Sequence, residues 1–130
     1  MRILVDTNRY RDFCEGRPEV VDWFRGSEEI RLPLVVVAEL RAGFQCGTAG
    51  LRNERVLQQF LGRPRSGVLL PDTETTHHFA RLFRQLRAQG TPIPVHDIWI
   101  AALTLQHDML LCSRDGHFDH LPQVPRLMEE

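Results

Sequence analysis

Short apolar runs alternate with longer segments of helical periodicity along this chain, and this alternation constrains the fold most. The runs, at residues 3–5, 30–32, 68–70 and 109–113, suit strands that are buried on both faces. Between them, apolar residues recur at helical spacing in segments that begin near Pro18, Leu34, Leu57, Asp72 and His96. We therefore predict an α/β fold with a central, mostly parallel sheet of four or five short strands, flanked by helices.

Residues that favour helix ends refine this prediction. Pro18 suits the first turn of a helix, and Gly26 suits a left-handed position just after its end. Asp72 is a predicted N-cap, and Gly90 closes the long helix that follows it. Residues 47–50 are a predicted loop, and residues 124–128 are a candidate edge strand. A length of 130 residues suits one domain, so we assign residues 1–130 to a single unit.

Composition excludes several classes of function. The chain contains no lysine, which excludes P-loop NTPases, Schiff-base enzymes and receiver-type phosphotransfer domains. A GC-rich genome would explain the use of arginine alone without any functional reason. The net charge of −1 gives no overall attraction for nucleic acid, although a local basic face can still provide it.

Location is also constrained by the sequence. No apolar run approaches the ~18 residues that a membrane-spanning helix needs, and the acid at Asp6 comes too early for a signal peptide. Cys14, Cys46 and Cys112 are odd in number and lack C-x-x-C spacing, so we expect reduced and mostly buried thiols. These features predict a cytoplasmic protein.

Four acids are predicted to meet at one edge of the sheet. Asp6 directly follows the first strand and Asp115 follows the last, while Glu39 and Asp97 lie near the beginnings of helices. In a parallel α/β fold the carboxyl ends of strands and the starts of the following helices face the same edge, where ligands bind. Convergence of Asp6, Glu39, Asp97 and Asp115 is therefore the main hypothesis from the sequence.

Glu39 is the most informative of the four acids. Its helical neighbours are Val35, Val36, Ala42 and Gly43, which predicts a buried face. An unpaired charge there would cost several kcal/mol, to order of magnitude, so we expect a cation or another partner.

Each acid also has a structural alternative. Asp6 and Asp97 can cap helices, Asp115 with Gly116 suits a turn, and Glu39 can pair with Arg41 or a more distant arginine.

Clustered carboxylates suit metal-assisted hydrolysis of a phosphodiester bond. Mg²⁺ or Mn²⁺ prefers carboxylate and water oxygens and also accepts phosphate oxygens. One ion can activate a water molecule, and a second ion can stabilise the leaving 3′-oxygen. The predicted products carry a 5′-phosphate and a 3′-hydroxyl. One or two ions remain equally open at this point.

Four short segments resemble those of PIN-domain ribonucleases, especially the toxins of the VapBC type. The segments are residues 5–8 (VDTN), 37–40 (VAEL), 97–102 (DIWIAA) and 113–118 (SRDGHF). Their order and the size of the chain make the resemblance specific, and it covers nearly the whole sequence.

The resemblance implies an endoribonuclease in which Asp6, Glu39, Asp97 and Asp115 bind Mg²⁺ or Mn²⁺. It implies that Thr7 or Asn8 and Ser113 support these ligands, that the protein forms a homodimer, and that an antitoxin protein binds it. Relatives often have asparagine at the place of His96, which gives His96 a shaping role. An additional acid that some relatives carry corresponds to Asp119.

Other interpretations of the sequence stay open. Arg9, Arg11 and Arg114 are candidate contacts for RNA phosphates, with solvated surface arginines as the alternative. His117 and His120 would make only half of a zinc site, because no second pair of ligands has suitable spacing.

The whole chain also has rival functions. His77, His78 and the His96-Asp97 pair invite comparison with the all-helical HD-type phosphohydrolases. A catalytically silent PIN-like binding module is the other rival. Trp23, Phe24, Phe79 and Phe83 are predicted core residues, some of which could also form a protein-binding groove.

Overall fold

The structure, a computed structural model, describes residues 1–129, which form a four-stranded sheet, six α-helices and a short 3₁₀ helix. In chain order the elements are β1 (Arg2–Val5), α1 (Thr7–Cys14), α2 (Pro18–Arg25), β2 (Glu29–Pro33), α3 (Leu34–Cys46), α4 (Gly50–Leu61), β3 (Ser66–Leu69), α5 (Thr73–Gln89), α6 (Val95–Gln106), β4 (Leu110–Cys112) and η1 (Gly116–His120).

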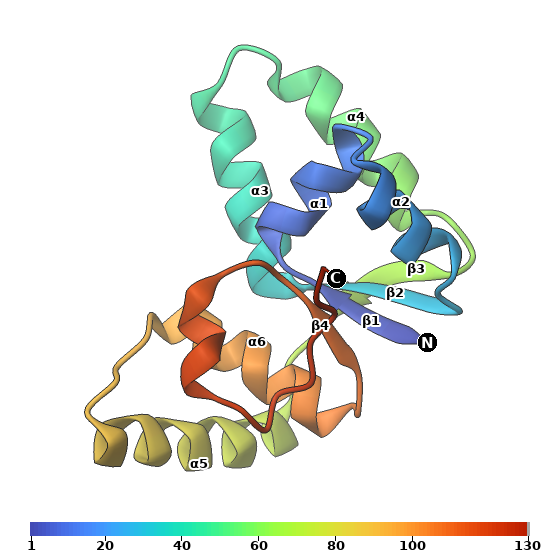
Figure 1. Ribbon diagram of the computed structural model, residues 1–130. Coiled ribbons are helices and arrows are strands. Elements are labelled where there is room, and N and C mark those ends of the chain that lie inside the picture. The colour runs from blue at the N-terminus through green and yellow to red at the C-terminus, as the bar shows by residue number, and fades with distance from the viewer. Residues whose placement is uncertain (130) are drawn as a thin grey trace.

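The sheet is parallel throughout, with the strand order β3-β2-β1-β4. Leu4 in β1 lies opposite Arg31 of β2 on one side and opposite Leu111 of β4 on the other. Helices α1 to α4 gather on one side of the sheet, and α5, α6 and η1 lie on the other (Figure 1). The predicted α/β architecture is therefore confirmed, and all carboxyl ends of the strands share one edge.

Local sequence explains where the helices begin and end. Asp72 caps α5 through its side chain, which accepts a hydrogen bond from the backbone N–H of Thr75, and the Thr75 hydroxyl accepts one from the N–H of Asp72. Gly90 ends the same helix in the left-handed conformation, with φ of 70°. Pro33 and Pro94 directly precede α3 and α6, so each of these helices begins abruptly at the sheet edge.

The core joins the central strand to the helices on both sides. Ile3, Leu4 and Val5 of β1 are fully buried, as expected for a strand covered on both faces. On one side, the rings of Phe13 and Phe24 stack with centroids 4.3 Å apart, which fixes α1 against α2. Burial of β1 holds the residue that follows it, Asp6, in a defined place at the edge.

Three details of the fold differ from the sequence prediction. Residues 7–14 form the separate helix α1, which the polar sequence TNRYRDFC did not predict. Gly26 ends α2 with a right-handed φ of −79°, because ordinary hydrogen bonds to Asp22 and Phe24 complete the turn. Up to residue 129, the C-terminal segment adds an isolated bridge between Leu111 and Arg126 in place of the predicted edge strand.

Predictions about particular side chains were correct only in part. Phe24 is buried and Trp23 and Phe79 are half-buried, whereas Phe83 is 45% exposed. The three cysteines are free thiols, but only Cys112 is buried, while Cys14 and Cys46 lie on the surface.

Within residues 1–129, none of the helices combines the length and apolar character that crossing a membrane requires.

Candidate metal centre

The four predicted acids come from four elements that meet at the carboxyl edge of the sheet. Asp6 lies between β1 and α1, Glu39 in the second turn of α3, Asp97 in the first turn of α6, and Asp115 between β4 and η1. The structure therefore brings together side chains that are up to 109 positions apart in the sequence.

Asp6 is a buried carboxylate held from both sides. Its Oδ1 accepts a hydrogen bond of 2.8 Å from the backbone N–H of Thr7, and its Oδ2 accepts one of 2.7 Å from the Ser113 hydroxyl. Burial raises the pKa of Asp6, and the nearby charges of Asp97 and Glu39 raise it further, against the two hydrogen bonds. Asp6 does cap α1, yet it also takes part in the electrostatics of the cluster.

Glu39 faces the same cluster, and no arginine among residues 1–129 pairs with it. Its Oε2 accepts a hydrogen bond of 2.9 Å from the Thr7 hydroxyl, and its Oε1 lies 3.6 Å from His96 Nε2. The alternative of a pair with Arg41 is wrong, because Arg41 pairs with Glu54. The predicted burial is only partly right, since the Glu39 side chain is 37% exposed.

Asp97 is the most deeply buried of the four and lies between two histidines. Its residue exposure is 2%, and its two oxygens lie 3.2 Å from His96 Nε2 and 2.8 Å from His117 Nδ1. Burial raises the pKa of Asp97, opposed by the hydrogen bond from His117, and the charge of Asp115 adds to the rise. Pro94 occupies the N-cap position of α6, so the helix-cap interpretation of Asp97 is wrong.

Asp115 combines a structural role with a place in the cluster. Its Oδ1 accepts a hydrogen bond of 2.9 Å from the backbone N–H of His117, which starts η1, and lies 3.1 Å from His117 Nδ1. The hydrogen bond to Asp97 raises the pKa of His117. His117 therefore pairs with two of the acids and not with His120, as a half zinc site would require.

Together these contacts close into a ring, here called the acid ring. It runs from Asp6 through Thr7 to Glu39 and His96, then through Asp97 and His117 to Asp115, and back through Ser113 to Asp6. Among residues 1–129, no arginine forms an ion pair with any of the four acids. The donor set of carboxylates and imidazoles fits a divalent cation, and ligand atoms of Asp97, Asp115 and His117 lie within 4.8 Å of one another.

The predicted supporting residues differ in where they lie. Thr7 and Ser113 belong to the acid ring, and Asn8 lies beside it, since its amide is 3.5 Å from the Ser113 hydroxyl. Asp119 instead points away and pairs with Arg126 at 2.6 Å, with its side chain 66% exposed. Asp119 therefore does not support the ring.

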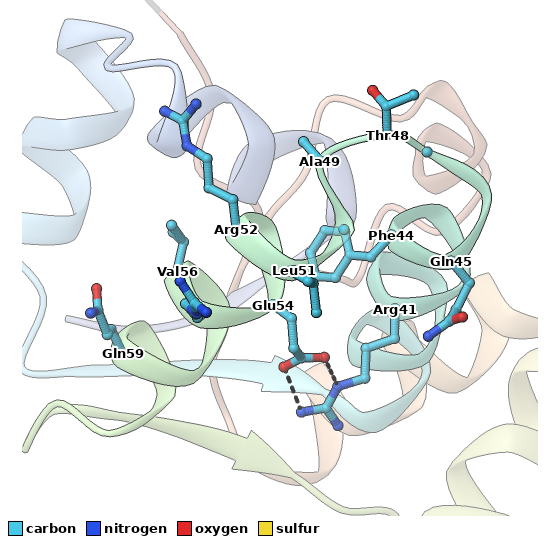
Figure 2. Close-up of a pocket in the computed structure, with 13 residues that line it drawn as sticks. Arg41, Phe44, Gln45, Thr48, Ala49, Leu51, Arg52, Glu54, Val56 and Gln59 are labelled. Carbon is cyan, nitrogen blue, oxygen red and sulfur yellow. Dashed lines mark hydrogen bonds and ion pairs between the residues drawn. The ribbon is translucent and has the colours of Figure 1, made fainter.

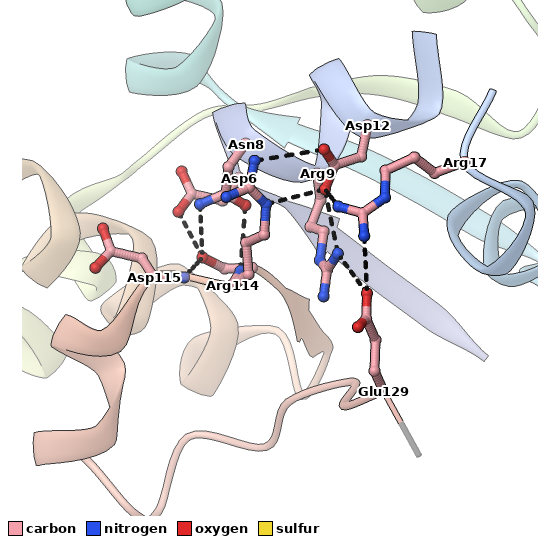
Figure 3. A network of polar contacts seen from close by, with 9 residues as sticks. Asp6, Asn8, Arg9, Asp12, Arg17, Arg114, Asp115 and Glu129 are labelled. Carbon is pink, nitrogen blue, oxygen red and sulfur yellow. Dashed lines mark hydrogen bonds and ion pairs between the residues drawn. The ribbon is translucent and has the colours of Figure 1, made fainter. Parts of the chain in front are cut away.

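A second polar cluster lies beside the ring, around the buried carboxylate of Asp12 (Figure 3). This arginine cluster consists of Arg9, Arg17 and Arg114, each within 3.4 Å of Asp12 Oδ2, and Glu129, which pairs with Arg9 at 3.0 Å. Burial alone would raise the pKa of Asp12, but the hydrogen bonds from Arg114 and Arg9 outweigh it and lower the pKa. No sequence pattern indicated this cluster.

The three arginines that the sequence offered as RNA contacts differ in exposure and in their partners. Arg9 is only 4% exposed and its guanidinium pairs with Asp12 and Glu129, so the prediction of a phosphate contact for Arg9 conflicts with its burial. The Arg114 side chain is 53% exposed and is held by Asp12 next to the acid ring. Arg11 is exposed on α1, where its guanidinium lies close to Gly43 of α3.

A separate groove of about 810 Å³ lies between α3 and α4, and none of the four acids lines it. Figure 2 shows Arg41 and Glu54 paired on its wall near Leu51 and Phe44. Leu51 is 81% exposed and Val56 is 41% exposed in this groove. Its exposed apolar side chains lie among charged ones such as Arg52 and Arg55, a lining that suits contact with a protein segment better than chemistry.

Comparison with known proteins finds matches over nearly the whole chain. The PIN domain family matches residues 3–124. The plasmid stability protein StbB of Pseudomonas syringae pv. tomato is 32% identical over 126 residues, which cover 90% of this chain and 91% of that protein. The VapC ribonuclease Y4jK of Sinorhizobium fredii is 29% identical and covers 87% and 86%, respectively.

The fold also matches a solved structure closely. The DNA-bound VapBC structure from Salmonella typhimurium superposes with a TM-score of 0.86 at 22% identity, over 98% of this chain and 97% of that chain. The strands β1 and β4 of this shared fold contradict the all-helical HD-type alternative.

Proposed function

The chain belongs to the PIN domain family, and from this we propose that it is a divalent-metal-dependent endoribonuclease acting as the toxin of a toxin–antitoxin pair. The observation that carries the proposal is the acid ring, in which four carboxylates converge and, within the described part of the chain, no arginine pairs with them. We also propose that residues 1–130 form one PIN-like nuclease domain.

Charge is the main physical support for a metal ion. Asp6 and Asp97 are 5% and 2% exposed, and a buried negative charge is costly unless a cation or hydrogen bonds compensate for it. We propose that Asp6, Glu39, Asp97 and Asp115 hold one or two Mg²⁺ or Mn²⁺ ions. When bound, such an ion activates water and stabilises negative charge on the phosphate.

The chain's own residues would orient the ligands and the RNA. Ser113 and Thr7 donate hydrogen bonds to Asp6 and Glu39, so each carboxylate keeps a fixed direction before the ion arrives. No side chain needs to act as a nucleophile, and the products would carry a 5′-phosphate and a 3′-hydroxyl.

We propose that Arg114 binds a phosphate of the RNA next to the scissile bond. Asp12 accepts two hydrogen bonds from the Arg114 guanidinium, and Asn8 accepts one from the Arg114 backbone N–H, which fixes the side chain beside Ser113. Half of the side chain stays exposed, so it can still form a charge-assisted hydrogen bond with phosphate. Arg11 would contact the RNA farther along α1.

The protein partner proposed for this chain is an antitoxin that binds the groove between α3 and α4. Support comes from the exposed Leu51 and Val56 and from the VapBC structure that shares the fold. Glu39 and Phe44 are five residues apart on α3, about 7.5 Å along the helix, so a partner in the groove would lie close to the acids.

Homodimer formation and a cytoplasmic location complete the proposal. Exposed apolar side chains of Leu70, Phe83 and Val95 are available for contact with a second copy. The three free cysteines agree with a reducing compartment.

Cleavage of a fluorescent RNA tests the proposal. We expect cleavage with Mg²⁺ or Mn²⁺, none with EDTA, and none with Asp97→Asn, while the control Asp22→Asn on the exposed face of α2 cleaves normally. No cleavage by the natural sequence with either ion would favour a catalytically silent binding module. Equal cleavage by Asp97→Asn or in EDTA would contradict the proposed use of the acid ring.

A further inference from the structure

His117 places a nitrogen atom inside the acid ring. Asp115 accepts a hydrogen bond from the backbone N–H of His117, and this cap turns the chain so that the imidazole faces α6. Its Nδ1 then lies 2.8 Å from Asp97 Oδ2 and 3.1 Å from Asp115 Oδ1. The imidazole therefore shares the space between two of the four carboxylates.

These distances suit three ligands on one cation. An octahedral ion about 2.1 Å from its ligands separates neighbouring ligands by about 3 Å, which agrees with both distances. The ligand atoms of Asp97, Asp115 and His117 also lie within 4.8 Å of one another. Coordination would also need an Nδ1 atom that carries no proton.

The chemistry of imidazole differs from that of carboxylates. A site made of carboxylates alone suits Mg²⁺, Ca²⁺ and Mn²⁺, whereas an imidazole nitrogen favours transition metals. Mg²⁺ gains little from such a nitrogen because it prefers oxygen and retains its water molecules. One nitrogen ligand would therefore shift the preference of the site among divalent ions.

We propose that His117 is a metal ligand and that it makes the acid ring select Mn²⁺ over Mg²⁺. The inference rests on the proposed function, because it concerns the same metal site. His120 lies in the same 3₁₀ helix, but its described hydrogen bond is made by its backbone carbonyl, which accepts from Gln89. His120 is therefore the matched control.

Calorimetric titration of the purified full chain with Mn²⁺ and with Mg²⁺ measures its affinity for each ion. We expect His117→Ala to weaken Mn²⁺ binding by about tenfold or more and to change Mg²⁺ binding by less than about twofold. His120→Ala should leave both affinities unchanged, and a circular dichroism spectrum should show that each variant is folded.

Pulsed electron paramagnetic resonance gives a second and more direct measurement. The Mn²⁺ complex should show coupling to an imidazole ¹⁴N that disappears in His117→Ala and persists in His120→Ala and His96→Ala. Coupling that persists in His117→Ala would overturn the assignment.

An increase in affinity for both ions in His117→Ala would also overturn the inference, because it would show that His117 competes with the cation. Unchanged affinities would do the same. Failure of the natural sequence to bind either ion would remove the proposed function as well, whereas RNA cleavage with no effect of His117→Ala on metal binding would remove the inference alone.

Discussion

The two ends of α1 carry buried aspartates with opposite surroundings. Asp6 and Asp12 are 5% and 2% exposed, respectively, and lie six residues apart. Burial, together with the charges of Asp97 and Glu39, raises the pKa of Asp6, whereas hydrogen bonds from Arg114 and Arg9 outweigh burial and lower the pKa of Asp12. Similar burial therefore produces opposite electrostatics, depending on the neighbours.

This contrast separates a structural acid from a candidate ligand. The protein supplies its own cations to Asp12, so this carboxylate joins α1 to Arg17 and Arg114, and Arg9 beside it pairs with Glu129 of the C-terminal segment. From the residues that the structure describes, Asp6 receives hydrogen bonds that orient it but no ion pair that balances its charge. A cation from solution would complete the acid ring, whereas the arginine cluster needs none.

Removal of the Asp6 charge should have the largest effect on function. We expect Asp6→Asn to lower the rate of RNA cleavage by about 1000-fold or more, since ligands of one site act as a unit. Without metal, Asp6→Asn should be at least as stable as the natural sequence. The substitution removes a buried carboxylate whose pKa is raised by the fold. Cleavage kinetics and urea unfolding in EDTA measure the two effects, and a variant that is both active and unstable would contradict the comparison.

The same substitution at Asp12 should mainly lower stability, in contrast to Asp6→Asn, which should mainly lower activity. Asp12→Asn leaves three arginines without their shared carboxylate, so we expect the free energy of unfolding to fall by about 3 kcal/mol. The pKa of Asp12 is lowered in the fold, so its contribution is complete above the ordinary aspartate pKa of about 3.9 and disappears as pH falls through the folded value.

Urea unfolding of both proteins at pH 7 and at pH 3 measures their free energies of unfolding and so tests this prediction. The difference in stability between the natural sequence and Asp12→Asn should be largest at pH 7 and smaller at pH 3. A difference that grows as the pH falls would show that Asp12 is not paired as described.

Divalent cations should stabilise the folded protein through the acid ring and not through the arginine cluster. At an ion concentration about 100 times the dissociation constant, binding to the folded state adds about 2.7 kcal/mol to the free energy of unfolding. We expect this gain in the natural sequence and in Asp12→Asn, and its loss in Asp6→Asn. Thermal melting with and without Mn²⁺ provides the readout, and equal stabilisation of all three proteins would mean that the ion binds elsewhere.

Arg114 links the two regions and should give the smallest effect. We expect Arg114→Ala to raise the KM for RNA about tenfold, the loss expected for one phosphate contact, with little change in kcat. Arg114→Lys should recover part of this loss, because lysine keeps the charge without the bidentate geometry. A large fall in kcat at unchanged KM would instead place Arg114 at the reacting phosphate itself.

The sequence predicted those features that depend on local patterns. Apolar runs identified β1 and the strand that precedes Asp115, and parallel topology then required Asp6 and Asp115 to share an edge. Asp72 and Gly90 marked the ends of α5 because capping depends on only a few neighbouring residues. The convergence of the four acids follows from these same rules.

Features that depend on contacts between distant residues were missed. Helix α1 is polar in sequence and is held by the burial of Arg9, Tyr10 and Asp12, which only the folded chain provides. The arginine cluster joins Asp12 to Arg114 and Glu129, so no local pattern could reveal it. His117 lies twenty residues after Asp97, and its place in the ring depends on the 3₁₀ turn that Asp115 caps.

The most direct test of the shared metal site is an anomalous difference map from a crystal grown with Mn²⁺. We predict a peak among the carboxylates of Asp6, Glu39, Asp97 and Asp115, and none beside Asp12. A map that shows no peak within the acid ring at saturating Mn²⁺, or a peak only at a remote surface carboxylate, would contradict the account.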